Sequence, residues 1–224
     1  MERLYFTTSD NVKIVANEFL PDKKKYPTPR GWVIFLHMMP ATKESWNPLA
    51  DQLQQAGYAG LAIDLRGHGA SEGGPNGYKE FSDAEHQDSI RDVDAAIDIL
   101  HGIGVRDDRI VLIGASIGAN LALQYASQHR AISCVVAISP GADYHGIVTK
   151  PFIEGFSENK RVLFIGSLDD DHVPGNEDEI EVLHAAVPDG VLAEKEIVDS
   201  GGHGTEILAN NPELINKILT FIQQ

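Results

Sequence analysis

The sequence is poor in cysteine, in long apolar segments and in basic residues, and each shortage excludes a class of protein. Cys134 is the single cysteine, so no disulfide can form within the chain. It lies in the apolar segment 134–138, which predicts a packed thiol rather than a reactive one. No apolar run reaches about 18 residues, so no membrane-spanning helix is expected. The N-terminal residues do not resemble a signal peptide, which favours a cytoplasmic location.

Acidic residues dominate, with 33 Asp and Glu against 18 Lys and Arg and a formal net charge of −15. Such a chain is not expected to bind nucleic acid by neutralising phosphates. The nine histidines show no spacing typical of metal ligands, and we expect neither a metal nor a cofactor. With 224 residues, 42% of them hydrophobic, the chain can bury a full core, and we expect residues 1–224 to form a single domain.

Apolar segments alternate with amphipathic ones along most of the chain. Residues 3–7 and 12–19 predict two antiparallel strands. Further strands are expected at 32–36, 58–63, 110–113, 134–138, 162–165 and 192–198. Helices are expected at 48–56, 81–101, 119–125, 177–186 and 212–221. This order predicts an α/β fold, with a mostly parallel eight-stranded sheet and helices on both faces.

The segment Gly114-Ala115-Ser116-Ile117-Gly118 stands between one of these strands and a helix. Gly-x-Ser-x-Gly in that context is typical of a nucleophile elbow, a sharp turn that exposes a serine hydroxyl to a histidine base. The two glycines let the turn form without collisions. Ser116 is therefore the candidate nucleophile. The alternative is a glycine-rich turn without a catalytic role.

Candidate partners follow Ser116 in the order that the motif requires, first an acid and then a histidine. The acid is one of three consecutive residues, Asp169, Asp170 and Asp171, and the histidine is His203, which stands between two glycines. Both segments come just after a predicted strand, where catalytic groups gather in a parallel sheet. His203 is the candidate general base, with a plain surface histidine as the alternative.

Together with other motifs, these features resemble the α/β-hydrolase superfamily, in its small esterase-like branch with a minimal lid. The resemblance covers essentially the whole chain. It includes His37 after the strand 32–36 and the stretch Asp64-Leu65-Arg66-Gly67-His68-Gly69-Ala70-Ser71, in which His68 is interpreted as structural. It implies a cofactor-free serine carboxylesterase that cleaves small acyl esters through an acyl-enzyme.

The resemblance also implies individual roles. Counting from Gly166 places the acid at Asp169, whereas counting back from Pro174 gives Asp170; Asp169 is preferred because a strand end fixes geometry better than a loop does. The two oxyanion-hole N–H groups are expected from Met39 and Ile117. Met38 stands where the superfamily usually has glycine, and both methionines are alternatively core residues.

The connection between the strands 134–138 and 162–165 is too short for a helical lid. Its large apolar side chains form either a wall of the acyl pocket or a short helix packed on the core; they are Tyr144, Phe152, Ile153 and Phe156. A small ester is the expected partner, and the oligomeric state stays open. Alternative functions are a cofactor-free perhydrolase, a thioesterase, or a noncatalytic ligand-binding protein of the same fold. Dienelactone hydrolases resemble this fold too, but carry cysteine at the elbow.

Overall fold

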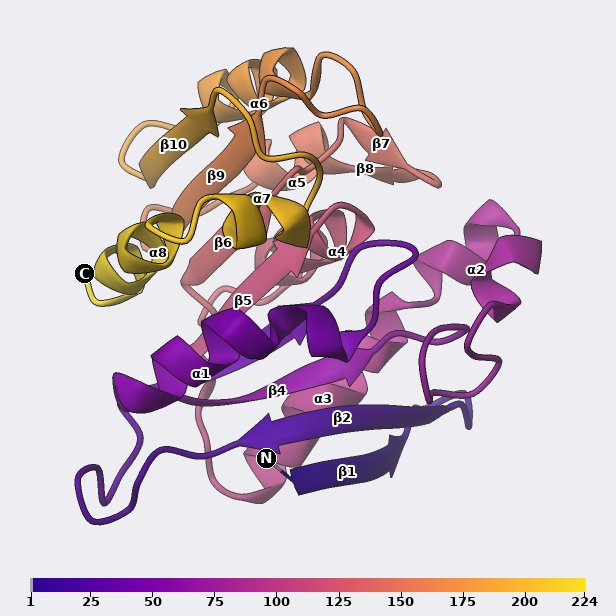
Figure 1. The fold of residues 1–224 in the computed structure, drawn as a ribbon, viewed down its shortest axis with the longest axis vertical. Helices are drawn as coiled ribbons and strands as arrows, with labels where there is room; N and C mark the ends of the chain where they lie inside the picture. The colour runs from indigo at the N-terminus through magenta and orange to yellow at the C-terminus, as the bar shows by residue number, and fades with distance from the viewer. Residues whose placement is uncertain (1) are drawn as a thin grey trace.

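The computed structural model describes residues 2–224 and is built around one large twisted sheet (Figure 1). Its strands are β1 (Glu2–Thr7), β2 (Lys13–Phe19), β3 (Trp32–Leu36), β4 (Ala59–Asp64), β5 (Ile110–Ala115), β6 (Cys134–Ile138), β9 (Arg161–Ser167) and β10 (Leu192–Val198). Their order in the sheet is β1-β2-β4-β3-β5-β6-β9-β10. The pairs β1–β2 and β2–β4 are antiparallel, and every other pair is parallel. The predicted mostly parallel eight-stranded sheet is confirmed.

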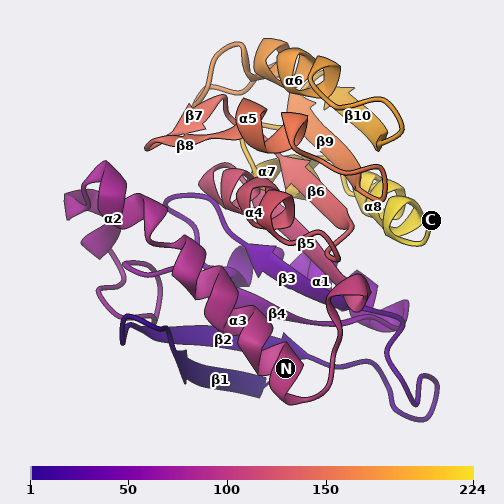
Figure 2. The ribbon, with the colours of Figure 1, turned by 180° about the vertical axis from the view of Figure 1, so that it is seen from behind.

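Helices cover both faces of the sheet, as Figures 1 and 2 show from opposite sides. They are α1 (Asn47–Gln55), α2 (Asp83–Gln87), α3 (Ile90–Gly102), α4 (Ile117–Gln128), α5 (Thr149–Glu154), α6 (Asn176–Ala185), α7 (Thr205–Asn210) and α8 (Leu214–Ile222). Helices α3, α4, α5 and α6 pack on one face, and α1, α7 and α8 pack on the other. None of the helices in residues 2–224 combines the length and the apolar character needed to cross a membrane.

The central strands are apolar throughout because each feeds two cores. In β3, Ile34 and Leu36 belong to the core under α3 and α4, whereas Val33 and Phe35 belong to the core under α1 and α8. Side chains alternate between the faces of a strand, so a sheet covered on both sides needs continuous apolar runs. The edge strand β10 differs, because none of its residues is fully buried.

The expected helix at 81–101 is wrong as a single element. Ser82 caps α2, accepting from the Glu85 N–H while the Glu85 carboxylate accepts from the Ser82 N–H. The N–H groups of Ser89 and Arg91 then bond three residues back, which tightens the chain into a separate turn before α3 begins. The expected helix at 212–221 begins later, at Leu214, and α7 precedes it.

The connection between β6 and β9 holds a two-stranded hairpin, β7 (Asp143–Tyr144) and β8 (Ile147–Val148), followed by α5. Ile153 and Phe156 are buried in the core beneath α4, and Phe152 packs against it. For these three residues the core-packing alternative is the correct one. Tyr144 is only partly buried.

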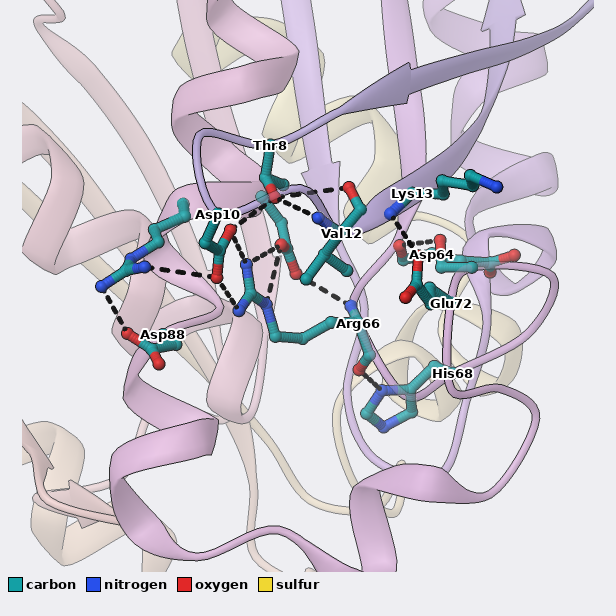
Figure 3. Close-up of polar contacts among 12 residues, drawn as sticks. Thr8, Asp10, Val12, Lys13, Asp64, Arg66, His68, Glu72 and Asp88 are labelled. Atoms are coloured by element: carbon teal, nitrogen blue, oxygen red, sulfur yellow. Dashed lines mark hydrogen bonds and ion pairs between the residues drawn. The ribbon is translucent and has the colours of Figure 1, made fainter.

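A network of charges ties the β1–β2 turn and α3 to the chain that leaves β4 (Figure 3). The Arg66 guanidinium donates to both carboxylate oxygens of Asp10, at 2.8 and 3.1 Å. Its Nε donates to Asp92 at 2.9 Å, and the Arg66 N–H donates to the other oxygen of that carboxylate at 2.8 Å. The network holds the loop after β4 in place at the carboxyl end of the sheet.

Candidate active site

Ser116 stands on a strained turn between β5 and α4. Its φ of 54° and ψ of −124° lie in a region that residues with a side chain rarely adopt. The strain is held by hydrogen bonds on both sides of the turn: the Ser116 N–H donates to the Ile138 carbonyl at 2.8 Å, and its carbonyl accepts from Ala119 and Asn120. The turn therefore lifts a serine side chain directly in front of a helix N-terminus.

The glycines of the motif are required by close approach. A Cβ on Gly118 would overlap the carbonyl of Leu36 at the end of β3, and a Cβ on Gly114 would overlap the carbonyl of Gly118. Any side chain at either position would push α4 away from the sheet. The steric reason for Gly-x-Ser-x-Gly, expected from the sequence, is visible at both glycines.

The loop after β10 brings His203 against this turn. A Cβ on the neighbouring Gly204 would overlap the Met38 sulfur and would lie 3.4 Å from the Ala115 Cβ. The Gly204 N–H donates to Ser139 Oγ at 2.9 Å, which ties the loop to the end of β6. His203 is buried, with 3% of its surface exposed. The loop that carries His203 thus packs, through Gly204, against Ala115, the residue before Ser116.

Asp170, not Asp169, contacts the histidine. Asp170 Oδ2 lies 2.6 Å from His203 Nδ1, and its Oδ1 accepts from the N–H groups of His172 and Val173 at 3.0 and 2.9 Å. The Asp169 carboxylate instead accepts from the N–H groups of Gly201 and Gly202, at 2.7 and 2.9 Å. The preference for Asp169 as the partner of His203 is therefore wrong. Asp169 fixes the backbone of the histidine loop, and those two hydrogen bonds lower the pKa of its carboxyl.

His172 also reaches this site, and sequence reasoning missed it. Its ring stacks on that of His203, with centroids 5.2 Å apart and planes 21° apart. The signal was its position two residues after Asp170, because any loop that brings Asp170 to His203 brings His172 along. Its exposed ring shields one face of the buried His203 ring.

The loop after β3 is anchored by a second buried histidine. His37 Nε2 accepts from the Leu65 N–H at 3.0 Å, so Nδ1 carries the proton and donates to the Met38 carbonyl at 2.8 Å. Burial, together with the nearby His68, lowers the pKa of His37 to about 4. The ring is neutral at pH 7, and it holds the Met38 backbone in the loop that meets α4 at Gly118.

The two predicted oxyanion-hole residues come from the start of α4 and from the loop after β3. Ile117 is the first residue of α4, where a helix N–H has no partner within the helix. Met39 is in the loop that His37 anchors and packs partly against the core under α4. Met38 is buried on the other face and contacts Gly204, so it is a core residue that also supports the histidine loop.

The end of β4 and the residues that follow it are held in place by buried hydrogen bonds. The Asp64 carboxylate accepts from the Lys43 N–H and Nζ, at 2.8 and 2.5 Å, and from the Ala70 N–H at 2.8 Å. His68 Nδ1 donates to the Arg66 carbonyl at 2.9 Å, and its ring stacks on Tyr78. The Asp64 and His68 side chains are buried, in agreement with a structural interpretation of His68. Within residues 2–224 no cluster of three or more His, Cys, Asp or Glu side chains is arranged to hold a metal ion.

The sequence was compared with protein families and with curated proteins, and each comparison found a match. Residues 27–169 match the family described as serine aminopeptidase, S33. A non-heme haloperoxidase from Rhodococcus erythropolis is 32% identical over 110 residues, which are 49% of this chain and 36% of that protein. The alignment thus covers little more than a third of that relative.

Solved structures resemble nearly the whole chain. An esterase from Pyrococcus furiosus superposes with a TM-score of 0.80 at 21% identity, over 99% of this chain and 89% of that one. Est1E from Butyrivibrio proteoclasticus, solved with ferulic acid, gives 0.78 at 17% identity over 99% and 100%. An enol-lactonase from Burkholderia xenovorans gives 0.73 at 14% identity, also over 99% and 100%. At these identities the likeness establishes the fold.

Proposed function

The chain belongs to the serine aminopeptidase S33 family, in the α/β-hydrolase superfamily, and from that premise we propose that it is a carboxylesterase that cleaves small acyl esters through an acyl-enzyme. The observation that carries the proposal is the hydrogen bond between Asp170 and the buried His203, on a loop packed against the strained turn of Ser116. A histidine oriented by a carboxylate near a serine on a sharp turn is the arrangement that activates a hydroxyl for acyl transfer.

In the proposed mechanism, Ser116 Oγ attacks the ester carbonyl while His203 Nε2 takes its proton. Asp170 holds the Nδ1–H tautomer of His203 and stabilises the imidazolium that forms. The N–H groups of Ile117 and Met39 receive the developing oxyanion. His203 then returns the proton to the leaving alcohol, and a water activated by the same ring hydrolyses the acyl-enzyme.

The second candidate function is a perhydrolase, favoured by the similarity to a haloperoxidase. It would use the same three side chains, with hydrogen peroxide in place of water as the nucleophile that attacks the acyl-enzyme. The test separating the two candidates compares the ratio of peracid to acid formed from one ester over a range of peroxide concentrations. An esterase keeps releasing acid at high peroxide, whereas a perhydrolase diverts most of the acyl group to peracid.

The experiment that tests the proposed function is covalent labelling with a fluorophosphonate, together with hydrolysis of a p-nitrophenyl ester. The wild-type protein should be labelled at Ser116, and Ser116→Ala should lose both labelling and turnover, the latter by on the order of 10⁴- to 10⁶-fold. Ser139→Ala is no suitable control because Ser139 supports the histidine loop; Ser127→Ala, on the distal part of α4, serves instead. Near-native turnover in Ser116→Ala would refute the proposed function.

A further inference from the structure

The hairpin β7–β8 next to the site has a closely defined shape. Tyr144 pairs with Ile147, and the two residues between them, His145 and Gly146, have φ angles of 53° and 80°. Two consecutive residues with positive φ form the tight turn whose twist matches that of its strands. The Asp143 carboxylate accepts from the Gly146 N–H at 2.6 Å. The side chain of Tyr144 is therefore carried on a rigid turn rather than on a loose loop.

Helix α4 holds both ends of this hairpin through one fully buried side chain. Asn120 lies about one turn beyond Ser116. Its Nδ2 donates to the carbonyls of Gly141 and Ile147, at 3.1 and 2.9 Å, and its Oδ1 accepts from the Gly141 N–H at 3.1 Å. The hairpin is thus fixed to the helix that begins at the candidate nucleophile.

Helix α2 holds the tip of the hairpin, and the two elements lie at the same rim of the sheet in both views (Figures 1 and 2). Gln87 Nε2 donates to the His145 carbonyl at 2.9 Å. The His145 ring stacks on His86, with centroids 3.9 Å apart, and its Nδ1 lies 3.0 Å from an Asp83 carboxylate oxygen. A segment fixed from both α4 and α2 offers its inward side chain in one position, which is what preorganisation requires.

That inward side chain is Tyr144, and its hydroxyl lies beside the nucleophile. The ring lies over Gly141, where an added Cβ would come within 2.6 Å of Cζ. The Tyr144 O–H donates to the Ser139 carbonyl, and the Ser116 N–H donates to the carbonyl of the preceding residue, Ile138, so the phenol and the nucleophile meet at the end of β6. Burial raises the pKa of the phenol against an opposing contribution from the Ser116 side chain, so the hydroxyl remains protonated. The hydrogen bond to the Ser139 carbonyl measures 3.3 Å, which makes it long and weak.

We propose that the Tyr144 hydroxyl is a further catalytic group, a third hydrogen-bond donor to the tetrahedral intermediate on Ser116. The inference rests on the proposed acyl transfer. The oxygens of the intermediate are separated from Ser116 Oγ by only two bonds, so a donor at the end of β6, next to Ser116, is close to them as well. The O–H leaves a weak carbonyl contact for an anionic oxygen, and hydrogen bonds to charged acceptors are the stronger ones.

The test is Tyr144→Phe, which removes one oxygen and keeps the ring. We expect kcat for a p-nitrophenyl ester to fall about 10- to 100-fold with KM changed less than about twofold, because the hydroxyl acts on the intermediate and not on the bound ester. The affinity for a trifluoromethyl ketone, which forms a tetrahedral adduct with serine, should fall by a similar factor. Tyr125→Phe is the matched control, since it removes another buried phenol hydroxyl, one whose ring stacks on His129.

The outcomes separate this proposal from the proposed function. If Tyr144→Phe keeps kcat within twofold while Ser116→Ala is inactive, the role of Tyr144 is overturned and the esterase function stands. A change in KM alone, or an equal loss in Tyr125→Phe, also overturns it, because a packing role would have that effect. A wild-type protein that neither reacts with fluorophosphonate nor hydrolyses esters refutes both. Thermal unfolding of each variant shows that the comparison is made between folded proteins.

Discussion

Acidification should weaken the fold through the buried ring of His37. Burial lowers its pKa from 6.5 to about 4, so the unfolded chain binds a proton that the folded protein rejects. The stabilisation is complete above pH 6.5 and is lost as the pH falls toward 4. The pKa difference of about 2.5 corresponds to about 3 kcal/mol in the free energy of unfolding, at 1.36 kcal/mol for each pKa unit. In the folded protein the ring stays neutral until the pH approaches 4, so its hydrogen bonds to Leu65 and Met38 persist above that pH.

The assay is urea unfolding of the wild type and of His37→Gln at several pH values between 7.5 and 4.5, followed by the fluorescence of the two tryptophans. Gln does not titrate, but it offers an amide near the Leu65 N–H. The variant should be less stable at pH 7, and the difference from wild type should shrink by about 3 kcal/mol as the pH approaches 4. His86, whose pKa burial also lowers to about 4, titrates in both proteins and cancels. A difference that stays constant with pH would refute the reasoning.

Three further predictions follow from the site and its supports. Asp170→Asn should reduce kcat by on the order of 10⁴-fold, the loss typical of a triad aspartate. Asp169→Asn keeps an oxygen that can accept from the Gly201 and Gly202 N–H groups, so it should change kcat little. The opposite order in matched kinetics would return the acid role to Asp169. Gly118→Ala should destabilise the protein severely or prevent folding, because the added Cβ meets the Leu36 carbonyl. Gly102 has open space around it, so Gly102→Ala should leave the free energy of unfolding unchanged or raise it by up to about 1 kcal/mol in chemical unfolding. Among p-nitrophenyl esters, acetate to butyrate should give the highest kcat/KM, since each buried methylene contributes about 0.8 kcal/mol only until the pocket is full; a maximum at ten carbons or more would contradict this.

The elbow could be predicted from the sequence because its requirements are local. Gly114 and Gly118 are needed for contacts with the adjoining strand and helix, so five consecutive residues carry the whole signal. The choice between Asp169 and Asp170 is different in kind. Strand β9 continues to Ser167, and the Leu168 N–H still bonds to the Val198 carbonyl, so the loop begins later than a count from Gly166 assumes. The hydrogen bonds that hold Asp169 away from His203 come from Gly201 and Gly202, which are more than 30 residues away in the sequence. No pattern around Asp169 indicates them.

Other differences have equally specific causes. A separate helix start at Ser82 could have been predicted, because Ser82 and Glu85 have the spacing of a capping box. The helical periodicity of the apolar residues that follow favoured one continuous helix over 81–101 instead. The hairpin β7–β8 could not be predicted, because its turn uses His145-Gly146 rather than the residue pairs that usually mark such turns. What places Tyr144 beside Ser116 is a set of contacts from α2 and α4, which no pattern within residues 139–160 contains.

The position of β10 at the edge of the sheet affects how the protein loses activity on heating. Ser116 follows the central strand β5, which has a parallel neighbour on each side, whereas His203 follows a strand that pairs only with β9 and has no fully buried residue. Proteins open first where few apolar contacts hold an element, in units smaller than the whole chain. Fraying of β10 would remove the proposed base from the nucleophile while the rest of the sheet stays folded. Inactivation would then be reversible on cooling and would begin below the temperature of global unfolding.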